Sequence, residues 1–284
     1  MRPMQRMMAF LRARVCERAA LGSVSGTYSP PLALVVAGAE QAGTAMLFRQ
    51  LAAHPALHVH RTDEMTYFTS ASEHGRGYLR AVRHHYGVVP GDVLLVARCD
   101  AMLDSPVALD RLAEHNPGVH VAVMLRDPVE RAWAAYWHAR RTRREPLPRF
   151  ETAIAAEELG HGERRYLGRG KYSRQLAHLF GRFPARQVHV FIAEDTVHDL
   201  GGACERLWSV FEAGRPVRTR VPTAGQRLCN VLCQALARLS GRGRSSSHLP
   251  TMAVPLRRRL VAYYEPYNQE LEHMLGRNLD AWRR

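Results

Sequence analysis

The sequence predicts an α/β protein built around a parallel β-sheet. Two observations support this. Short apolar runs alternate with segments that carry helical spacing and helical end signals, which is typical of parallel sheets. The runs are also apolar throughout, as expected for strands buried on both faces. They cover residues 32–38, 93–97, 119–125 and 188–192. Parallel strands place their carboxyl ends at one edge of the sheet, where such folds bind ligands.

Capping and breaking residues mark the helices between these strands. The helix at 44–53 follows the first strand, and His54-Pro55 ends it. Ser105 and Pro106 begin the helix at 105–115, and the turn at 116–118 closes it. Further helices are expected at 128–140, 150–158, 172–180, 202–211 and 255–275, and the basic segment 214–250 is expected to contain a loop. We predict an N-terminal extension, residues 1–27, followed by one domain, residues 28–284.

Composition restricts the classes of function. The chain has 284 residues and 46% hydrophobic content, which suffices for a full core. Its net charge of +14 makes an anionic ligand plausible. Lys171 is the only lysine among the 40 basic residues, so the excess reflects an arginine bias along the chain. No zinc-finger, RNP-like or basic-zipper pattern is present, and neither a nucleic-acid partner nor a metal site is expected.

Cysteine usage and hydropathy indicate the compartment. Five cysteines without a CxxC pair are typical of reduced, structural thiols in a cytoplasmic protein. No apolar run approaches the roughly 20 residues of a membrane span. Arginines interrupt the apolar part of residues 1–15, which argues against a signal peptide. Nothing in the pattern indicates an oligomeric state.

The turn after the first strand has the composition of a phosphate-binding loop. Gly38 and Gly43 lie five residues apart, and Thr44 places a hydroxyl at the start of the following helix. Glycines let the backbone approach an anion with its N–H groups pointing inward. Gly43 precedes Thr44 directly, without the lysine of nucleoside-triphosphate-binding loops, which argues against an ATPase or a kinase. The alternative is an ordinary tight turn.

A second anion-binding feature follows the strand at 119–125. Arg126 ends this strand, Asp127 can cap the next helix and Pro128 suits its first position. Glu130 stands where a capping box needs a carboxylate. A guanidinium at a helix N-terminus suits a phosphate, although a capped helix with a surface arginine remains an alternative. Together with the glycine loop, Arg126 indicates a nucleotide with phosphates at two positions.

Several ordered motifs resemble the sulfotransferases that use 3′-phosphoadenosine 5′-phosphosulfate (PAPS), in particular their bacterial and heparan-sulfate-like branch. The similarity runs from about residue 34 to residue 282. The matching segments are Gly38–Ala45, His54-Pro55, Asp63–Phe68, Leu125–Tyr136, Gly170–Tyr172, Phe191–Asp195 and Tyr264–Trp282. The resemblance implies a P-loop-like three-layer fold, with a central parallel sheet flanked by helices.

The resemblance also implies an activity and its residues. The reaction would move a sulfuryl group from PAPS to a hydroxyl or amine of a small-molecule or glycan acceptor in bacterial secondary metabolism, leaving PAP. Glu64 occupies the position of the catalytic base, and His58 and His60 are alternative bases. The positions implied for the nucleotide are Gly38, Gln41, Ala42, Gly43, Thr44 and Ala45 around the 5′-phosphosulfate, with Arg126 and Ala134 near the 3′-phosphate. Tyr172 is a further position implied for binding the nucleotide.

Three departures from the family pattern bear on activity. Gln41 replaces the loop lysine, Ala134 replaces a serine, and Ala97 stands where an acidic residue often occurs. Loss of a transition-state donor typically costs roughly 10²–10³ in rate. A nearby arginine could supply the missing charge, and the candidates are Arg49, Arg61 and Arg98. The alternative function is a sulfotransferase-fold protein with lost or altered chemistry that binds a PAP-like nucleotide.

Overall fold

The computed structural model describes residues 31–54, 56–89, 93–162, 164–212 and 249–284. Its five described strands form one parallel sheet in the order β2-β3-β1-β4-β5, which confirms the predicted fold class. The strands are β1 (Leu32–Val36), β2 (Leu57–Val59), β3 (Leu94–Arg98), β4 (His120–Leu125) and β5 (Val188–Ile192). The predicted N-terminal extension and nearly all of the predicted loop at 214–250 lie outside the described residues.

Four of these strands lie where the apolar runs predict them. β2 was not predicted, because it has only three residues and the polar His58 stands at its centre. It forms as an edge strand beside β3, where His58 pairs in register with Leu95. Tertiary pairing therefore creates this strand, and no local pattern marks it.

The helices agree with the predicted ranges to within about two residues wherever a cap or an apolar stripe marks them. The described helices are α2 (Thr44–Leu51), α3 (Ala71–Gly75), α4 (Tyr78–Tyr86), α5 (Pro106–His115), α6 (Pro128–Arg141), α7 (Phe150–Glu158), α8 (Tyr172–Arg182), α9 (Ala193–Thr196), α10 (Leu200–Glu212) and α12 (Val254–Leu275). Short 3-10 turns are η1 (Gly168–Gly170), η2 (Ala185–Gln187) and η5 (Asp280–Arg283). Helices α3 and α4 were not predicted, because α3 has no buried residue and α4 is rich in Arg and His.

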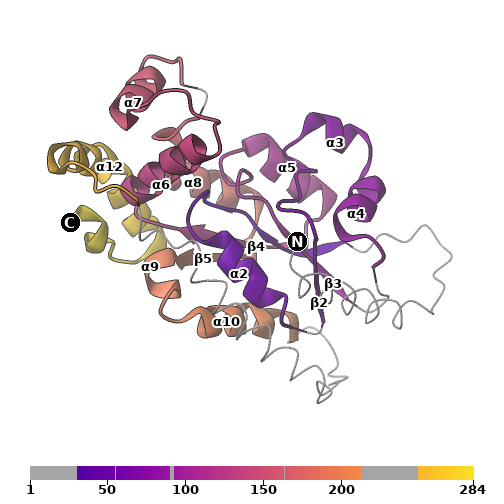
Figure 1. The fold of residues 1–284 in the computed structure, drawn as a ribbon. Coiled ribbons are helices and arrows are strands. Elements are labelled where there is room, and N and C mark those ends of the chain that lie inside the picture. Colours follow the sequence, from indigo (N-terminus) through magenta and orange to yellow (C-terminus); the bar gives the residue numbers. More distant parts are fainter. Residues whose placement is uncertain (1–30, 55, 90–92, 163, 213–248) are drawn as a thin grey trace, which may run out of the picture.

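The helices cover both faces of the sheet (Figure 1). α2 packs against α10 on one face, and α5, α8 and α12 contact one another in a row on the other. The handedness of the crossovers explains why helices lie on both faces. The chain moves across the sheet in one direction from β1 to β2 and in the opposite direction from β3 to β4, so right-handed crossovers place the connecting helices on opposite faces. None of the described helices is long and apolar enough to span a membrane.

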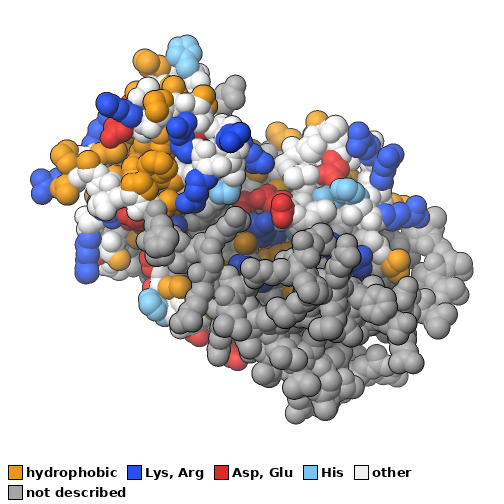
Figure 2. All heavy atoms as spheres, in the orientation of Figure 1, with side chains coloured by type: hydrophobic (Ala, Val, Ile, Leu, Met, Phe, Trp, Pro, Cys, Tyr) orange, Lys and Arg blue, Asp and Glu red, His pale blue; other side chains and the backbone are white. Residues whose placement is uncertain are grey.

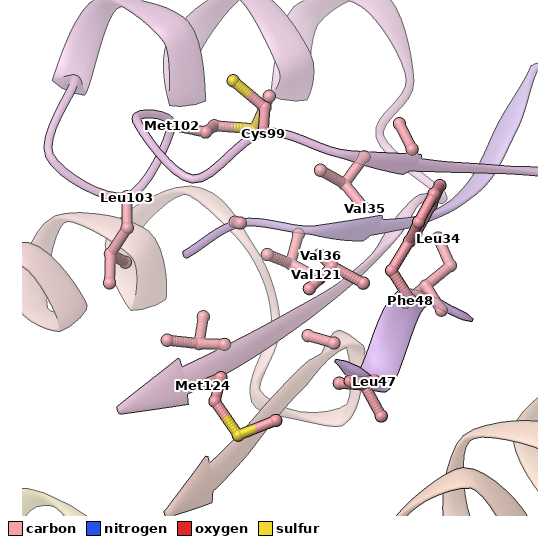
Figure 3. Close-up of a cluster of buried hydrophobic side chains, with 14 of the residues drawn as sticks. Leu34, Val35, Val36, Leu47, Phe48, Cys99, Met102, Leu103, Val121 and Met124 are labelled. Atoms are coloured by element: carbon pink, nitrogen blue, oxygen red, sulfur yellow. The ribbon is translucent and has the colours of Figure 1, made fainter. Parts of the chain in front are cut away.

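The main core surrounds the central strand. Leu34, Val35 and Val36 of β1 are fully buried, because strands lie on both sides of β1 and helices on both faces (Figure 3). Phe48 of α2 closes one face, and Cys99 lies on the other. Cys99 is a free, buried thiol, as is Cys204, in agreement with the prediction of structural thiols.

Candidate functional site

The loop after β1 requires glycine at two positions. Gly38 has a φ of +106°, and a Cβ there would collide with the carbonyl oxygen of Asp100. Gly43 has a φ of +93°, but a Cβ there would meet nothing within 4 Å. Gly38 therefore lets the loop approach the end of β3, while Gly43 faces open space at the start of α2.

Most backbone N–H groups of this loop have no partner among the described residues. Ala39 donates to the Met124 carbonyl and Ala42 to the Ala39 carbonyl. In the part of the chain that the structure describes, no acceptor faces the N–H groups of Glu40, Gln41, Gly43, Thr44 and Ala45. No side chain caps α2, whose dipole adds a partial positive charge at the same place. A cluster of unpaired amides of this kind binds anions.

Thr44 connects the loop to the end of β3. Its hydroxyl donates a 2.7 Å hydrogen bond to Oδ1 of Asp100, and Nη1 of Arg98 donates a 2.9 Å bond to Oδ2. Burial raises the pKa of Asp100, while Arg98 and Thr44 oppose this shift. The sequence analysis missed Asp100, although its place just beyond a parallel strand was a usable signal.

Glu64 joins the same network. Its Oε2 accepts a 3.0 Å hydrogen bond from the backbone N–H of Asp100, and its Oε1 lies 4.0 Å from Nη1 of Arg98. Burial, followed by the charge of Asp100, raises the pKa of Glu64. The side chain is still 31% exposed. Glu64 is therefore a carboxylate with raised proton affinity, fixed beside the loop and open to solvent.

The two histidines that were considered as alternative bases lie deeper than Glu64. His60 is 4% exposed, and burial lowers its pKa to about 4. Its Nε2 accepts from the Arg98 N–H at 3.0 Å, and its Nδ1 lies 2.9 Å from the Thr62 carbonyl. Burial also lowers the pKa of His58, whose Nε2 is buried without a partner among the described residues. This burial makes both less suited than Glu64 to contact an acceptor.

Arg126 lies against the glycine loop. Its Nη1 donates a 3.1 Å hydrogen bond to the carbonyl of Gln41, and its side chain is 22% exposed. Tyr172, fully buried at the start of α8, donates a 2.9 Å bond to the carbonyl of Arg126. The two anion-binding features predicted from the sequence are thus adjacent. Through this bond the Tyr172 hydroxyl fixes the backbone of Arg126.

The N-terminus of α6 confirms one capping prediction and corrects another. Asp127 accepts from the N–H groups of Val129 (2.8 Å) and Glu130 (3.4 Å), as an N-cap should. The reciprocal bond from Glu130 is absent, because Glu194 accepts the Asp127 N–H at 2.9 Å. Glu130 instead pairs with Arg257 of α12, whose Nη2 also contacts Asp127. The N–H groups of Asp127, Val129 and Glu130 are therefore occupied, which leaves the guanidinium of Arg126 as the group available to an anion at this helix start.

The three departures from the family pattern lie at different depths. Gln41 is half-buried in the loop with a φ of 64°, and its carbonyl accepts from Arg126. Ala134 is 5% exposed on α6, and Ala97 is 2% exposed in β3. Ala134 and Ala97 are thus both buried in regular elements. Of the three departures, Gln41 is the one that lies in the loop itself.

The structure distinguishes among the arginines that could replace the lost charge. Nε of Arg49 donates to the Ala45 carbonyl of its own helix, and Arg61 lies against Gly87. Of the three candidates, Arg98 is the one that bonds to Asp100, the carboxylate that also accepts from Thr44. A further arginine, Arg169 of η1, forms an ion pair with Glu40 inside the loop. The sequence analysis missed Arg169, although it stands next to the Gly170–Tyr172 motif.

The surface above this edge of the sheet is hollowed. Figure 2 shows a notch between the part formed by α6, α7 and α12 and the part formed by α3, α4 and α5. Acidic and basic side chains gather at its base. The unpaired amides, Arg126 and Glu64 belong to the segments that follow the carboxyl ends of β1, β4 and β2, where a ligand is expected.

Several solved structures are similar to this chain. No protein-family profile matches the chain. A sulfotransferase from Alicyclobacillus acidocaldarius is 25% identical, covers 90% of this chain and 100% of its own, and superposes with a TM-score of 0.64. The sulfotransferase domain of the Synechococcus PCC 7002 olefin synthase is 15% identical over 65% of this chain and 74% of its own, with a TM-score of 0.44. Retinol dehydratase, solved with retinol and PAP, is 15% identical over 78% of this chain and 68% of its own, with a TM-score of 0.38.

The last two structures superpose too loosely to support an assignment. The first superposes well over nearly the whole chain, so the chain has the fold of that sulfotransferase. The fold that the motifs imply is therefore confirmed, and the resemblance to sulfotransferases is supported by this solved structure.

Proposed function

We propose that this protein transfers a sulfuryl group from PAPS to a hydroxyl or amine of a small-molecule or glycan acceptor. The observation that carries the proposal is the hydrogen bond from Arg126 to the Gln41 carbonyl. It joins the cluster of amides that have no partner among the described residues to a partly exposed guanidinium. A nucleotide with one anionic group at each place is complementary to this pair.

The chain's residues fit such a nucleotide. The free N–H groups of Glu40, Gln41, Gly43, Thr44 and Ala45 would hold the 5′-phosphosulfate, and Arg126 would hold the 3′-phosphate. Tyr172 keeps Arg126 in place through the backbone. Ala134 offers no hydroxyl, so Arg126 carries this part of recognition with less help than the family serine provides. PAPS, when bound, supplies an activated sulfuryl group on a phosphate leaving group.

Glu64 is the residue that we assign as the general base. It would accept the proton of the acceptor as the acceptor oxygen or nitrogen bonds to sulfur and the bond from sulfur to the phosphate oxygen breaks. Burial and the charge of Asp100 raise its pKa, and a raised pKa strengthens it as a base. The Asp100 N–H fixes Oε2, so Oε1, which lies 4.0 Å from Nη1 of Arg98, would meet the acceptor.

Charge on the leaving phosphate must be balanced without the family lysine. Gln41 can donate a hydrogen bond but carries no charge. Arg98 and Arg169 bring guanidinium groups to either side of the loop, through Asp100 and Glu40 respectively. We assign them the compensating positive charge.

Calorimetry and a transfer assay test the proposal together. Wild-type protein should bind PAP, and Arg126→Met should weaken binding by about tenfold or more, the loss expected for a charge-assisted contact. Glu64→Gln should keep PAP affinity and lower sulfation of a panel of phenols, alcohols, amines and glycan fragments by roughly 10²–10⁴. Glu114→Gln, at a carboxylate 75% exposed on α5, is the matched control and should change neither. Wild-type protein that binds no PAP would overturn the proposal.

Gln41 favours a second candidate function, nucleotide binding with lost or altered transfer chemistry. Gln41→Lys separates the two. If Arg98 and Arg169 compensate, the lysine should change turnover by less than about tenfold, since the charge is already present. A rise of roughly 10²–10³ would instead mean that the native loop is impaired. PAP binding without any transfer by the wild type would favour the second candidate.

A further inference from the structure

Helices α3 and α4 bring three metal-binding side chains together near the segment that carries Glu64. Glu73 comes from α3, and His84 and His85 come from α4. One ligand atom from each lies within 4.8 Å of the others. None of the three residues belongs to the site described above. Their spacing in the sequence does not match that of a zinc finger.

His85 is held in the orientation of a metal ligand. The Thr62 hydroxyl donates a 3.1 Å bond to the Glu64 carbonyl, so its oxygen accepts from Nδ1 of His85 at 2.6 Å. This fixes the tautomer and leaves Nε2 directed at Glu73. Histidines that bind metals almost always use their second ring nitrogen in this way. The His85 side chain is 4% exposed, so burial holds its position.

Glu73 is prepared in a similar manner. Its Oε2 accepts a 2.6 Å bond from the Thr66 hydroxyl, and its Oε1 lies 2.7 Å from Nε2 of His85. His84 is exposed, so the third ligand faces solvent, from which an ion would arrive.

We propose that Glu73, His84 and His85 bind one Zn²⁺ ion, with water as the fourth ligand. Two imidazole nitrogens and one carboxylate oxygen suit Zn²⁺, whereas Mg²⁺ and Ca²⁺ prefer oxygen donors alone. The ion would lie between Nε2 of His85 and Oε1 of Glu73, in place of their hydrogen bond. Their two atoms must separate from 2.7 Å to about 3.3 Å, the spacing that tetrahedral bonds of about 2.0–2.1 Å impose.

An ion at this position would also hold residues 61–64, the segment that carries Glu64. His85 holds residues 61–64 at two points, through the bond to the Thr62 hydroxyl and through its carbonyl, which accepts the Arg61 N–H at 2.8 Å. Thr62 in turn bonds the carbonyl of Glu64. Zn²⁺ would therefore fasten α3 and α4 to the segment that carries Glu64, as a structural ion with no part in the transfer chemistry.

Calorimetric titration of the full-length, untagged chain with ZnCl₂ tests this site. One ion should bind per chain, and Glu73→Gln and His84→Ala should each weaken binding by about tenfold or more. His84 is exposed, so His84→Ala should not affect folding. His178→Ala is the matched control, because His178 also pairs with a carboxylate, Asp110, at 2.9 Å. It should bind Zn²⁺ as the wild type does.

Two further measurements support or overturn the assignment. Thr62→Val, which keeps all three ligands, should weaken Zn²⁺ binding by about 10–100-fold. Co²⁺ in place of Zn²⁺ should give the intense visible absorption of a tetrahedral site, and MgCl₂ should give no binding heat. The proposal fails if no ion binds at about 100 μM Zn²⁺, or if Glu73→Gln and His84→Ala bind as tightly as the wild type.

Discussion

Replacement of Thr44 by valine tests whether the bond between the loop and the end of β3 stabilises the protein. Valine has nearly the same shape as threonine, so packing is kept and the hydroxyl alone is lost. Thr44 is 2% exposed, and its hydroxyl donates to the Asp100 carboxylate at 2.7 Å. The Asp100 side chain is 13% exposed, so water replaces the lost donor poorly.

The expected loss follows from this geometry. A hydrogen bond to a charged group contributes about 1.5–3 kcal/mol. Arg98 still satisfies the other carboxylate oxygen, which favours the lower half of that range, about 2 kcal/mol. With a urea m-value of about 2–3 kcal/mol/M, the unfolding midpoint should fall by about 0.7–1 M. The bond stabilises ionised Asp100, so its contribution is present above the Asp100 pKa and is lost as the pH falls through it.

Urea unfolding, followed by circular dichroism near neutral pH, measures this loss. Thr142→Val is the control, because the exposed Thr142 hydroxyl donates only to the carbonyls of its own helix at His138 and Ala139. It should change stability by less than about 0.5 kcal/mol. The reasoning is refuted if Thr44→Val lies within that same margin of the wild type, or if its loss persists undiminished in acid.

Two further substitutions test the groups around the site. Burial and Asp100 raise the folded-state pKa of Glu64, so ionised Glu64 disfavours folding, and this cost disappears as the pH falls below its ordinary 4.5. Glu64→Gln should therefore gain about 1 kcal/mol in urea unfolding near neutral pH and nothing in acid; a loss of stability near neutral pH would contradict this. Tyr172→Phe removes a fully buried donor to the Arg126 carbonyl, which should cost about 1–2 kcal/mol of stability and weaken PAP binding. Unchanged urea midpoint and PAP affinity would show that Tyr172 does not position Arg126.

Local signals predicted those elements whose residues interact with near neighbours in the chain. Ser105 caps α5 through a bond three residues away, and Asp127 caps α6 in the same manner. The fully apolar run of β1 predicts a strand buried on both faces, which is where β1 lies. The caps need no partner from elsewhere in the chain, and the apolar run marks β1 without knowledge of the strands that pair with it, so the sequence alone predicts these features.

Other elements depend on partners that are distant in sequence. β2 pairs with β3 nearly 40 residues later, and its three residues have no pattern of their own. The capping box at α6 failed because Glu194 and Arg257, both more than 60 residues away, interact more favourably with Asp127 and Glu130. A pattern of neighbours cannot reveal such competition between charges.

The sequence by itself determined the α/β class, the glycine loop, the arginine after β4 and Glu64 as a candidate base. Only the tertiary structure decided which of the three arginines reaches the network beside the loop, because Arg49, Arg61 and Arg98 are equivalent until their side chains are placed. It also brought Asp100 to Thr44 across 56 residues and Glu73 to His85 across two helices. Electrostatic and hydrogen-bond interactions act over a few ångströms in space, so their partners are determined by the fold and not by spacing along the chain.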